Sequence, residues 1–180
     1  RIHTRPVAGL PLIHVETPRN EGWKKYGKRW LDIVGSAVML LLLSIPLLAV
    51  ALLVKMTSKG PVFYRQERVG LNGQPFEMLK FRSMRENADA ELQTLLAAQG
   101  SDGKPLFKVK DDPRITPIGK FLRKYSVDEF PQLINVLRGE MSLVGPRPQR
   151  EAEVALYDNI AYRRLLIKPG MSGLWQVSGR

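Results

Sequence analysis

The sequence contains no cysteine, and its two histidines, His3 and His14, lie close to the start of the chain. The absence of cysteine excludes disulfides, thiolate nucleophiles and cysteine-based zinc sites. The chain after residue 14 has no histidine for a Ser-His-Asp triad or a histidine-rich metal site. P-loop and G-x-G-x-x-G spacings are absent as well. Catalysis by this chain would therefore use carboxylates, Lys, Arg, Tyr, Ser or Thr.

Acidic residues are too few to balance the basic ones. The 180 residues include 28 Lys and Arg against 17 Asp and Glu, which gives a net charge of +11. Such a charge favours polyanionic partners, namely nucleic acid, anionic lipid headgroups or phosphorylated substrates. Because the basic residues are not interleaved with aromatic ones in a nucleic-acid-binding pattern, we expect no nucleic-acid partner. The length suits one domain with a core plus a membrane element.

Residues 33–54 form an uncharged run of 22 residues with leucine at each of positions 40–43. At about 1.5 Å per residue, a straight helix of this length spans roughly 33 Å, enough for the hydrocarbon core of a bilayer. Polar chain precedes the run and no small-residue cleavage site follows it, which argues against a signal peptide. A buried core helix is the remaining soluble alternative.

Two features bear on how residues 33–54 sit in a membrane. Basic residues flank both ends of the run, so the positive-inside rule assigns no orientation, as expected if both ends stay in the cytoplasm. Pro46 lies near the middle and predicts a kink, and the Ser44 hydroxyl can bond a carbonyl that the kink releases. From these residues alone, a re-entrant helix and an ordinary kinked transmembrane helix are equally consistent.

The segments on either side of the run show weaker patterns. Residues 1–22 contain Pro6, Pro11 and Pro18 and predict an extended linker, in which the apolar stretch 10–15 could be the last strand of a missing upstream domain. Asn72-Gly73 separates two strand-like stretches, 62–69 and 75–81, and this is a strong hairpin signal. An amphipathic helix is predicted over residues 86–98, followed by a loop over 99–105.

Three more helices are predicted after residue 115. Thr116-Pro117 marks the start of the first, whose apolar stripe contains Ile118, Phe121, Leu122 and Tyr125. The second covers residues 133–138 and ends at Gly139, and the third is a long helix over 150–167. The expected fold class is α+β, mainly α, with a membrane helix, amphipathic helices and one β-hairpin, and without βαβ alternation.

Asp128 and Glu129 are the first candidates for chemistry. Ser126 and Glu129 match a capping box, which is the structural alternative to a catalytic role. A helix that starts at Asp128 instead puts Pro131 in its first turn, where proline is tolerated. Asp128 would then lie at a helix N-terminus, where the dipole favours an ionised carboxylate and neighbouring phosphates. Such a carboxylate can attack phosphorus, and its acidic neighbour can hold Mg²⁺.

The remaining candidates are basic. Lys80 and Arg82 alternate with an apolar residue in a strand-like stretch, which predicts both cations on one face. Arg147 lies between two prolines in a stiff turn and suits bidentate phosphate recognition. Arg114 and Arg123 add to a basic surface suited to headgroups or phosphate. The structural alternative for Lys80 and Arg82 is the polar face of a half-buried hairpin, and that for Arg147 is a solvated basic loop.

Six blocks, in order, carry a resemblance to a known family: KRWLDIVGS, GPVFYRQERVG, LKFRSM, DDPRITPIGKFLRKYSVDEFPQL, GEMSLVGPRP and KPGMSGLWQVSGR. They run from about residue 28 to residue 180. The chain resembles the bacterial sugar transferase family, the monotopic polyprenyl-phosphate phosphoglycosyl transferases, in its longer form with upstream domains. The family's adjacent Ser-Pro is here separated by one residue, in Ser44-Ile45-Pro46.

The resemblance implies a two-step transfer of sugar-1-phosphate from a UDP-sugar to polyprenyl phosphate, with release of UMP. Asp128 matches the nucleophile, Glu129 the acid that holds Mg²⁺ with it, and Arg123, Arg147 and Lys80 match residues around the phosphates. We therefore expect membrane lipids, UDP-sugar and polyprenyl phosphate as partners, and a homo-oligomer is possible. The expected location is the bacterial inner membrane, with the catalytic domain on its cytoplasmic face.

The resemblance also favours the re-entrant form of residues 33–54, broken at Ser44 and Pro46. It divides the chain into a linker from a missing upstream domain (1–22), a membrane re-entrant helix (23–59) and a cytoplasmic catalytic domain (60–180) that continues further in the family. The alternative function, from a different class, is a non-catalytic membrane-anchored scaffold that binds anionic lipid or an assembly partner.

Overall fold

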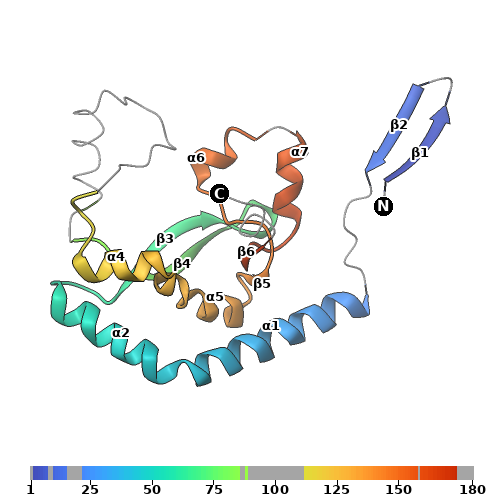
Figure 1. Ribbon diagram of the computed structural model, residues 1–180. Helices are drawn as coiled ribbons and strands as arrows, with labels where there is room; N and C mark the ends of the chain where they lie inside the picture. The colour runs from blue at the N-terminus through green and yellow to red at the C-terminus, as the bar shows by residue number, and fades with distance from the viewer. Residues whose placement is uncertain are drawn as a thin grey trace, which may run out of the picture. The chain divides into compact units, whose positions relative to one another are not determined.

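The computed structural model describes residues 2–7, 10–15, 22–85, 88, 112–157 and 159–173 (Figure 1). The chain forms two compact units, Arg1–Leu31 and Asp32–Arg180. The fold is mixed, mostly helical with small two-stranded sheets, as expected for the α+β class. Most of the helix predicted over residues 86–98, the loop over 99–105 and the end of the chain around Trp175 lie outside the described residues.

The first unit contains a β-hairpin where a linker was expected. Strands β1 (Ile2–Val7) and β2 (Leu10–Val15) pair antiparallel. Pro6 lies opposite Pro11 near the turn end of this pair. A two-stranded ribbon has two open edges, where proline costs no ladder hydrogen bond, so these prolines are compatible with strands. Strand β2 coincides with the apolar stretch 10–15. The assignment of residues 1–22 as a linker from an upstream domain stays a prediction.

The apolar run folds as two helices with a sharp bend between them. Helix α1 (Trp23–Leu42) and helix α2 (Ser44–Thr57) are separated at Leu43 and bent by 66°. Pro46 is the third residue of α2, so it cannot donate to the carbonyl of Leu42 and its ring crowds that carbonyl. The Ser44 hydroxyl donates to the carbonyl of Leu41 at 2.7 Å. The predicted kink is therefore confirmed, and the Ser44 hydroxyl bonds the carbonyl next to the one that Pro46 leaves without its donor.

Among the described residues, no single helix has the length and composition to cross a membrane, whereas the bent pair Tyr26–Leu42 and Ser44–Thr57 passes that test jointly. Large apolar side chains are exposed along both helices; in α2 they are Ile45, Leu48, Leu52, Leu53 and Met56. One residue of α2, Val54, is instead fully buried against Phe81 and Leu122. The end of the bent pair is thus part of the folded core.

The start of the apolar run is attached as well. One carboxylate oxygen of Asp32 in α1 accepts the Leu143 N–H at 3.0 Å and the Ser142 hydroxyl at 3.1 Å. Both donors belong to strand β5 (Ser142–Val144). Asp32 is almost completely buried. Hydrogen bonds of this kind satisfy a carboxylate that would be costly to bury alone.

The predicted hairpin is confirmed. Strands β3 (Phe63–Val69) and β4 (Pro75–Phe81) pair antiparallel, with Tyr64 opposite Lys80 and Arg68 opposite Phe76. The short 3₁₀ turn η1 (Leu71–Gly73) joins them, and Asn72 and Gly73 both have positive φ, at 55° and 78°. Asn and Gly tolerate that conformation better than other residues, which is why this dipeptide marks the turn.

Helix α4 (Pro117–Lys124) begins as predicted, because the Thr116 hydroxyl accepts the Gly119 N–H at 3.0 Å. Leu122 is fully buried, but Phe121 and Tyr125 are exposed and pack on each other, with ring centroids 4.9 Å apart. The apolar stripe is therefore only partly a core face. Helix α5 (Gln132–Arg138) follows and ends at Gly139, whose φ is 88°.

The long helix predicted over residues 150–167 is wrong. The structure has three short pieces there: α6 (Glu151–Val154), α7 (Asn159–Tyr162) and the 3₁₀ turn η3 (Arg163–Leu166). Helix α6 already ends at Val154, with the C-cap at Ala155, so the apolar period over 150–167 is not that of one helix.

These pieces connect β5 to strand β6 (Gly170–Ser172), and the two strands pair in parallel. The expectation of no β-α-β arrangement is wrong here, since strands of three residues are too short to show a period. The Gly170 N–H donates to the carbonyl of Pro146 at 2.8 Å, and a side chain at Gly170 would collide with the backbone of Gly145. This close contact holds the loop that carries Arg147.

Candidate functional site

Asp128 lies in a short turn between α4 and α5 (Figure 1). The turn is a 3₁₀ helix, η2 (Val127–Glu129), and its preceding residue, Ser126, has left-handed backbone angles and makes no side-chain cap. The capping-box alternative is therefore wrong. The prediction that an α-helix starts at Asp128 is also wrong, because α5 begins four residues later at Gln132. The 3₁₀ geometry leaves Asp128 before the helix.

Burial changes the acidity of Asp128. Its side chain is 8% exposed, and desolvation raises its pKa above the usual 3.8. Two cations oppose this shift, Lys80 on β4 and Arg123 on α4, whereas the charge of neighbouring Glu129 adds to it. Groups on β4, α4 and η2 therefore act on this one carboxyl group, and of these elements only β4 is distant in the sequence.

Lys80 and Glu129 form an ion pair at the same turn. The Lys80 ammonium lies 2.9 Å from Oε1 of Glu129, and the two side chains are 22% and 32% exposed. The contact joins β4 to η2 across 49 residues of sequence. The pair is partly screened by water, so its main consequence here is orientation: it fixes a cation beside Asp128.

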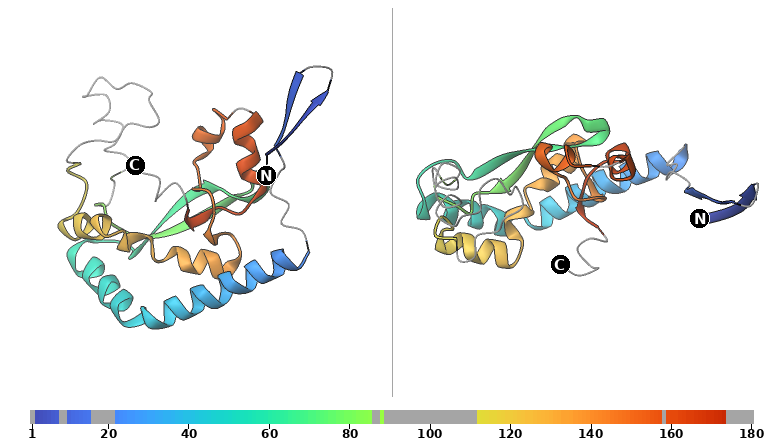
Figure 2. Two further views of the ribbon diagram at one scale, coloured as in Figure 1. Left: turned by 45° about the vertical axis from the view of Figure 1, so that its right-hand side comes forward. Right: turned by 90° about the horizontal axis from the view of Figure 1, so that it is seen from above.

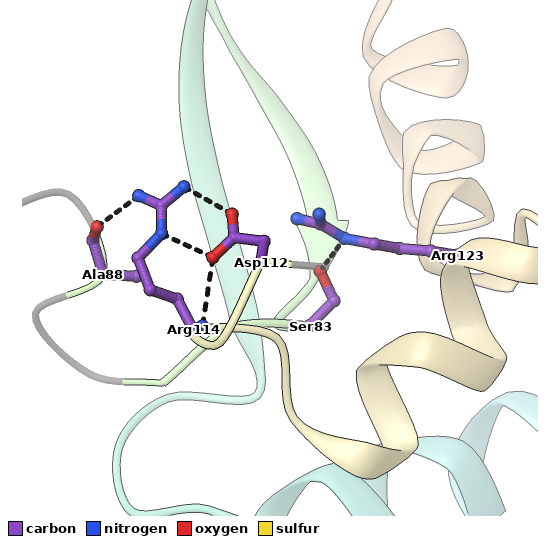
Figure 3. A network of polar contacts seen from close by, with 5 residues as sticks. All are labelled: Ser83, Ala88, Asp112, Arg114 and Arg123. Atoms are coloured by element: carbon purple, nitrogen blue, oxygen red, sulfur yellow. Dashed lines mark hydrogen bonds and ion pairs between the residues drawn. The ribbon is translucent and has the colours of Figure 1, made fainter. Parts of the chain in front are cut away.

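Arg123 is held near the turn by a side-chain contact. Its Nε donates to the hydroxyl of Ser83 at 2.8 Å (Figure 3). Ser83 itself is buried, and its carbonyl accepts the Thr116 N–H at 3.1 Å. The residue as a whole remains exposed. Arg123 is thus both positioned and accessible, which suits contact with a phosphate.

Arg114 does not belong to a basic surface, so that expectation is wrong. It is 5% exposed, and its Nε and Nη2 donate to the two carboxylate oxygens of Asp112 at 2.8 and 2.5 Å (Figure 3). Its Nη1 donates to the carbonyl of Ala88 at 2.6 Å. These bonds hold the pKa of Asp112 below its usual range. The pair fixes the backbone that leads into α4 and is structural in this geometry.

Arg82 and Lys80 contact different parts of the molecule. Arg82 lies just after β4, is 7% exposed, and donates from Nη2 to the Ser58 carbonyl at 2.8 Å and hydroxyl at 2.7 Å. Ser58 directly follows α2, so Arg82 binds the C-terminal end of the membrane-type helix, where a cation is favoured. Lys80 instead contacts Glu129. Lys80 and Arg82 therefore do not form the shared cationic face that the strand pattern predicted.

Arg147 is exposed in the turn after β5, as predicted. Its charge acts on Arg68 of β3, and the groups that shift the pKa of Asp128 are Lys80, Glu129 and Arg123. The structure therefore brings Lys80, Arg123, Asp128 and Glu129 together and associates Arg147 with another cationic neighbourhood. Sequence reasoning missed Arg68, because its position in a polar strand next to a hairpin turn gave no distinguishing signal.

The carboxylates of the turn are the candidate ligands for a metal ion. Within the described ranges, no three His, Asp or Glu side chains gather as a ligand cluster. Mg²⁺ in phosphate chemistry is held by one or two carboxylates together with substrate oxygens, and needs no such cluster. The adjacent carboxylates of Asp128 and Glu129 fit this mode of binding.

Comparisons with known proteins identify the family of the chain. The family model described as bacterial sugar transferase matches residues 23–180. The chain is 47% identical over 156 residues to the exopolysaccharide production protein ExoY of Sinorhizobium fredii, covering 85% of this chain and 69% of that protein. It is 45% identical over 174 residues to the undecaprenyl-phosphate galactose phosphotransferase of Salmonella typhimurium, covering 94% and 36%.

A third relative is the UDP-glucose:undecaprenyl-phosphate glucose-1-phosphate transferase of Klebsiella pneumoniae, 40% identical over 180 residues. That match covers 98% of this chain and 36% of the relative. The chain thus spans about a third of the length of these last two proteins. Family membership follows from the family match over residues 23–180 and from the identities of 40–47%. The chain belongs to the bacterial sugar transferase family and is an enzyme of the sugar-phosphate transferase type.

Proposed function

We propose that the chain transfers sugar-1-phosphate from a UDP-sugar to polyprenyl phosphate and releases UMP, as the first membrane step of exopolysaccharide, capsule or O-antigen synthesis. The observation that carries this proposal is the buried Asp128 carboxyl group beside the Lys80–Glu129 pair and Arg123. Relatives named for UDP-glucose, galactose and undecaprenyl phosphate support a UDP-hexose donor and a polyprenyl acceptor.

The chemistry we propose has two displacements at one phosphorus atom. An Asp128 oxygen attacks the sugar-linked phosphorus of the UDP-sugar, forming a carboxyl–phosphorus bond. The bond from that phosphorus to the bridging oxygen breaks, and UMP leaves with the oxygen and its electron pair. An oxygen of polyprenyl phosphate then attacks the same phosphorus and displaces the Asp128 carboxylate, which gives polyprenyl-diphospho-sugar.

The environment of Asp128 supports this role. Attack requires the ionised carboxylate, and a raised pKa makes that carboxylate more basic and more nucleophilic once it forms. The charges of Lys80 and Arg123 favour the ionised form. The same two cations suit the negative charge on the phosphoryl oxygens during transfer, where fixed charges contribute a large part of catalysis.

Mg²⁺ is the cofactor we propose, held by Glu129 with Asp128. When bound, it would neutralise charge on the substrate phosphate oxygens. Lys80 binds Oε1 of Glu129 and so restricts the orientation of that carboxylate. Arg147, implied by the family resemblance as a phosphate contact, remains a prediction for this reaction.

We propose that α1 and α2 enter the cytoplasmic face of a bacterial inner membrane and return to it, so that Asp128 works at the interface. The exposed apolar side chains along both helices and the 66° bend support this arrangement. Because the sequence has no cysteine, Lys24→Cys and Lys59→Cys give clean single labels. Both should react from the cytoplasmic side, and labelling from opposite sides would restore a spanning helix.

The enzymatic proposal is tested by trapping the intermediate. The protein in nanodiscs is incubated with UDP-glucose or UDP-galactose that carries ³²P in the sugar-linked phosphate, without lipid acceptor. Covalent label and UMP release are expected from the wild type, and none from Asp128→Asn. Glu77→Gln, which removes an exposed carboxylate on the same hairpin, is the matched control and should label normally.

Two results would contradict the proposal. Label that persists in Asp128→Asn would remove Asp128 as nucleophile. A wild-type protein that releases no UMP from any UDP-sugar, yet binds anionic lipid, would favour the non-catalytic scaffold.

A further inference from the structure

Asn135 of α5 is a polar side chain in the core of the unit that carries Asp128. It is completely buried, and its carboxamide reaches β4, which lies alongside α5 in Figure 1 and in the left view of Figure 2. Oδ1 accepts the Leu79 N–H at 3.0 Å, and Nδ2 donates to the Glu77 carbonyl at 2.7 Å. Nδ2 also donates to Oε2 of Glu140 at 2.7 Å. Both amide hydrogens and the amide oxygen are therefore used.

The backbone groups that Asn135 binds belong to the open edge of the β3–β4 hairpin. At the β3 edge, the Arg82 N–H donates to the Val62 carbonyl at 2.9 Å. Backbone groups of alternate residues point to opposite edges of an antiparallel strand, so those of Glu77 and Leu79 point away from β3. A carboxamide offers one acceptor and one donor there, as a residue of a third strand would. Asn135 therefore binds β4 at one defined place along its length.

A side-chain contact fixes the same place on β4. Val136, the next residue of α5, is fully buried and packs with Met78 and Met141. Met78 lies between the two residues whose backbone groups Asn135 binds. Because side chains alternate along a strand, Met78 and Lys80 are on the same face of β4. The face of β4 that carries Lys80 is thus the face that packs with α5.

The position of Lys80 depends on this attachment. Its ammonium lies 2.9 Å from Oε1 of Glu129, in the turn η2 that leads into α5. Asn135 therefore joins the strand of the cation to the helix that follows the two carboxylates. A slip of β4 along α5 that kept each side chain on its face would be two residues, about 7 Å. Such a slip would separate Lys80 from Glu129 and from Asp128.

We propose that Asn135 is a positioning residue for the reaction at Asp128, because its carboxamide sets β4 along α5 so that the Lys80 ammonium stands beside the carboxylates of η2. The consequence for catalysis rests on the proposed transfer, whereas the positioning is a property of the folded chain. Loss of a buried amide with a structural role alone would lower stability without changing the charge around Asp128.

The test measures the pKa of the Asp128 carboxyl group, using the full chain in nanodiscs without substrate. Infrared difference spectroscopy follows the band of the protonated carboxyl group, assigned by its absence in Asp128→Asn. Lys80 is the largest charge that lowers this pKa, Arg123 also lowers it and Glu129 raises it. Lys80→Gln should therefore raise the pKa of Asp128, and Asn135→Ala should raise it too. In the Lys80→Gln background, Asn135→Ala should cause no further rise, because the two changes act through one cation.

Ser142→Ala is the matched control. The Ser142 hydroxyl is also fully buried, and it bonds Oδ1 of Asp32 at 3.1 Å and the Val144 carbonyl at 3.0 Å, on β5 instead of β4. This variant should lower the thermal midpoint and leave the pKa of Asp128 unchanged. Asn135→Ser, whose hydroxyl can keep one of the lost bonds, is the milder variant should Asn135→Ala not fold, and the same directions are expected from it.

Transfer gives a second readout. With the ³²P-labelled UDP-sugar, Asn135→Ala should form the covalent label on the order of 10²-fold more slowly, the scale of a misplaced catalytic group. The acidic limb of its pH–rate profile should move to higher pH. A folded Asn135 variant with the wild-type pKa at Asp128, or a rise that persists in full in the Lys80→Gln background, would overturn the positioning role. A wild type that shows the pKa coupling but takes no label would support that role and contradict the proposed transfer.

Discussion

The Asp112–Arg114 pair offers a quantitative test of the structure. Both side chains are buried, at 7% and 5% exposure, and two side-chain hydrogen bonds join them. Asp112→Ala would leave the Arg114 guanidinium buried without its carboxylate. Breaking one partner of such a pair costs about 3–5 kcal/mol. At about 2–4 °C per kcal/mol for a domain of this size, the thermal midpoint should fall by roughly 6–20 °C.

The pH dependence gives a second measure of the same pair. Because Arg114 lowers the pKa of Asp112 in the folded state, the stabilisation is fully present above the unfolded value of 3.8 and is lost as pH falls through the folded pKa. The wild type should therefore lose stability in this acidic range more steeply than Asp112→Ala, which lacks the titrating group.

The assay is thermal unfolding of the detergent-solubilised protein, followed by near-ultraviolet circular dichroism. Replacing both partners, Asp112→Leu with Arg114→Met, should restore much of the loss, since an apolar pair leaves no buried charge. Glu77→Gln breaks an exposed ion pair and should cost less than about 1 kcal/mol. A midpoint of Asp112→Ala within 1–2 °C of wild type, about 0.5 kcal/mol, would refute the reasoning.

Two further predictions follow from burial and backbone contact. Asp128→Asn should abolish transfer and raise the thermal midpoint at pH 7. Burial raises the pKa of Asp128, so its contribution to the stability of the fold is complete below pH 3.8 and is lost as pH rises through the folded pKa. An unchanged or lower midpoint would contradict this reasoning. Gly170→Ala should reduce soluble expression and transfer together, because its Cβ would meet the backbone of Gly145, whereas Gly27→Ala, which has open space around it, should behave as wild type; normal transfer by Gly170→Ala would show that the contact is not needed.

Local signals predicted the elements that depend on local chemistry. Asn72-Gly73 predicts a turn because these residues accept positive φ, and the β3–β4 pair has the expected bounds within one residue. Thr116-Pro117 predicts a helix start because threonine caps and proline needs no donor there. Pro46 predicts the bend between α1 and α2 because proline removes a helical hydrogen bond within its own segment. Such patterns are read correctly without knowledge of the rest of the fold.

Tertiary contacts decided what the sequence could not predict. Arg114 looks like a surface cation in the sequence, yet Asp112 makes its burial possible. Ser126 has the residue type of a cap, but its left-handed backbone excludes that role and shapes the turn of Asp128. The proximity of Lys80 to Glu129 depends on pairing across 49 residues, which no local period encodes. The motif alone identified Asp128 as the candidate nucleophile. Only the folded structure shows which charged side chains surround it.

The bent helix pair is attached at both ends to the unit that carries Asp128. Asp32 binds the strand β5 near the start, and Val54, 22 residues later, packs against Phe81 and Leu122. The angle between the two arms is therefore fixed by the protein core, and a thinner or thicker bilayer should tilt the whole unit before it straightens the bend. In the proposed membrane arrangement, lipid thickness would then set how deeply the turn that carries Asp128 sits below the headgroups, and with it which lipid phosphates that turn can reach.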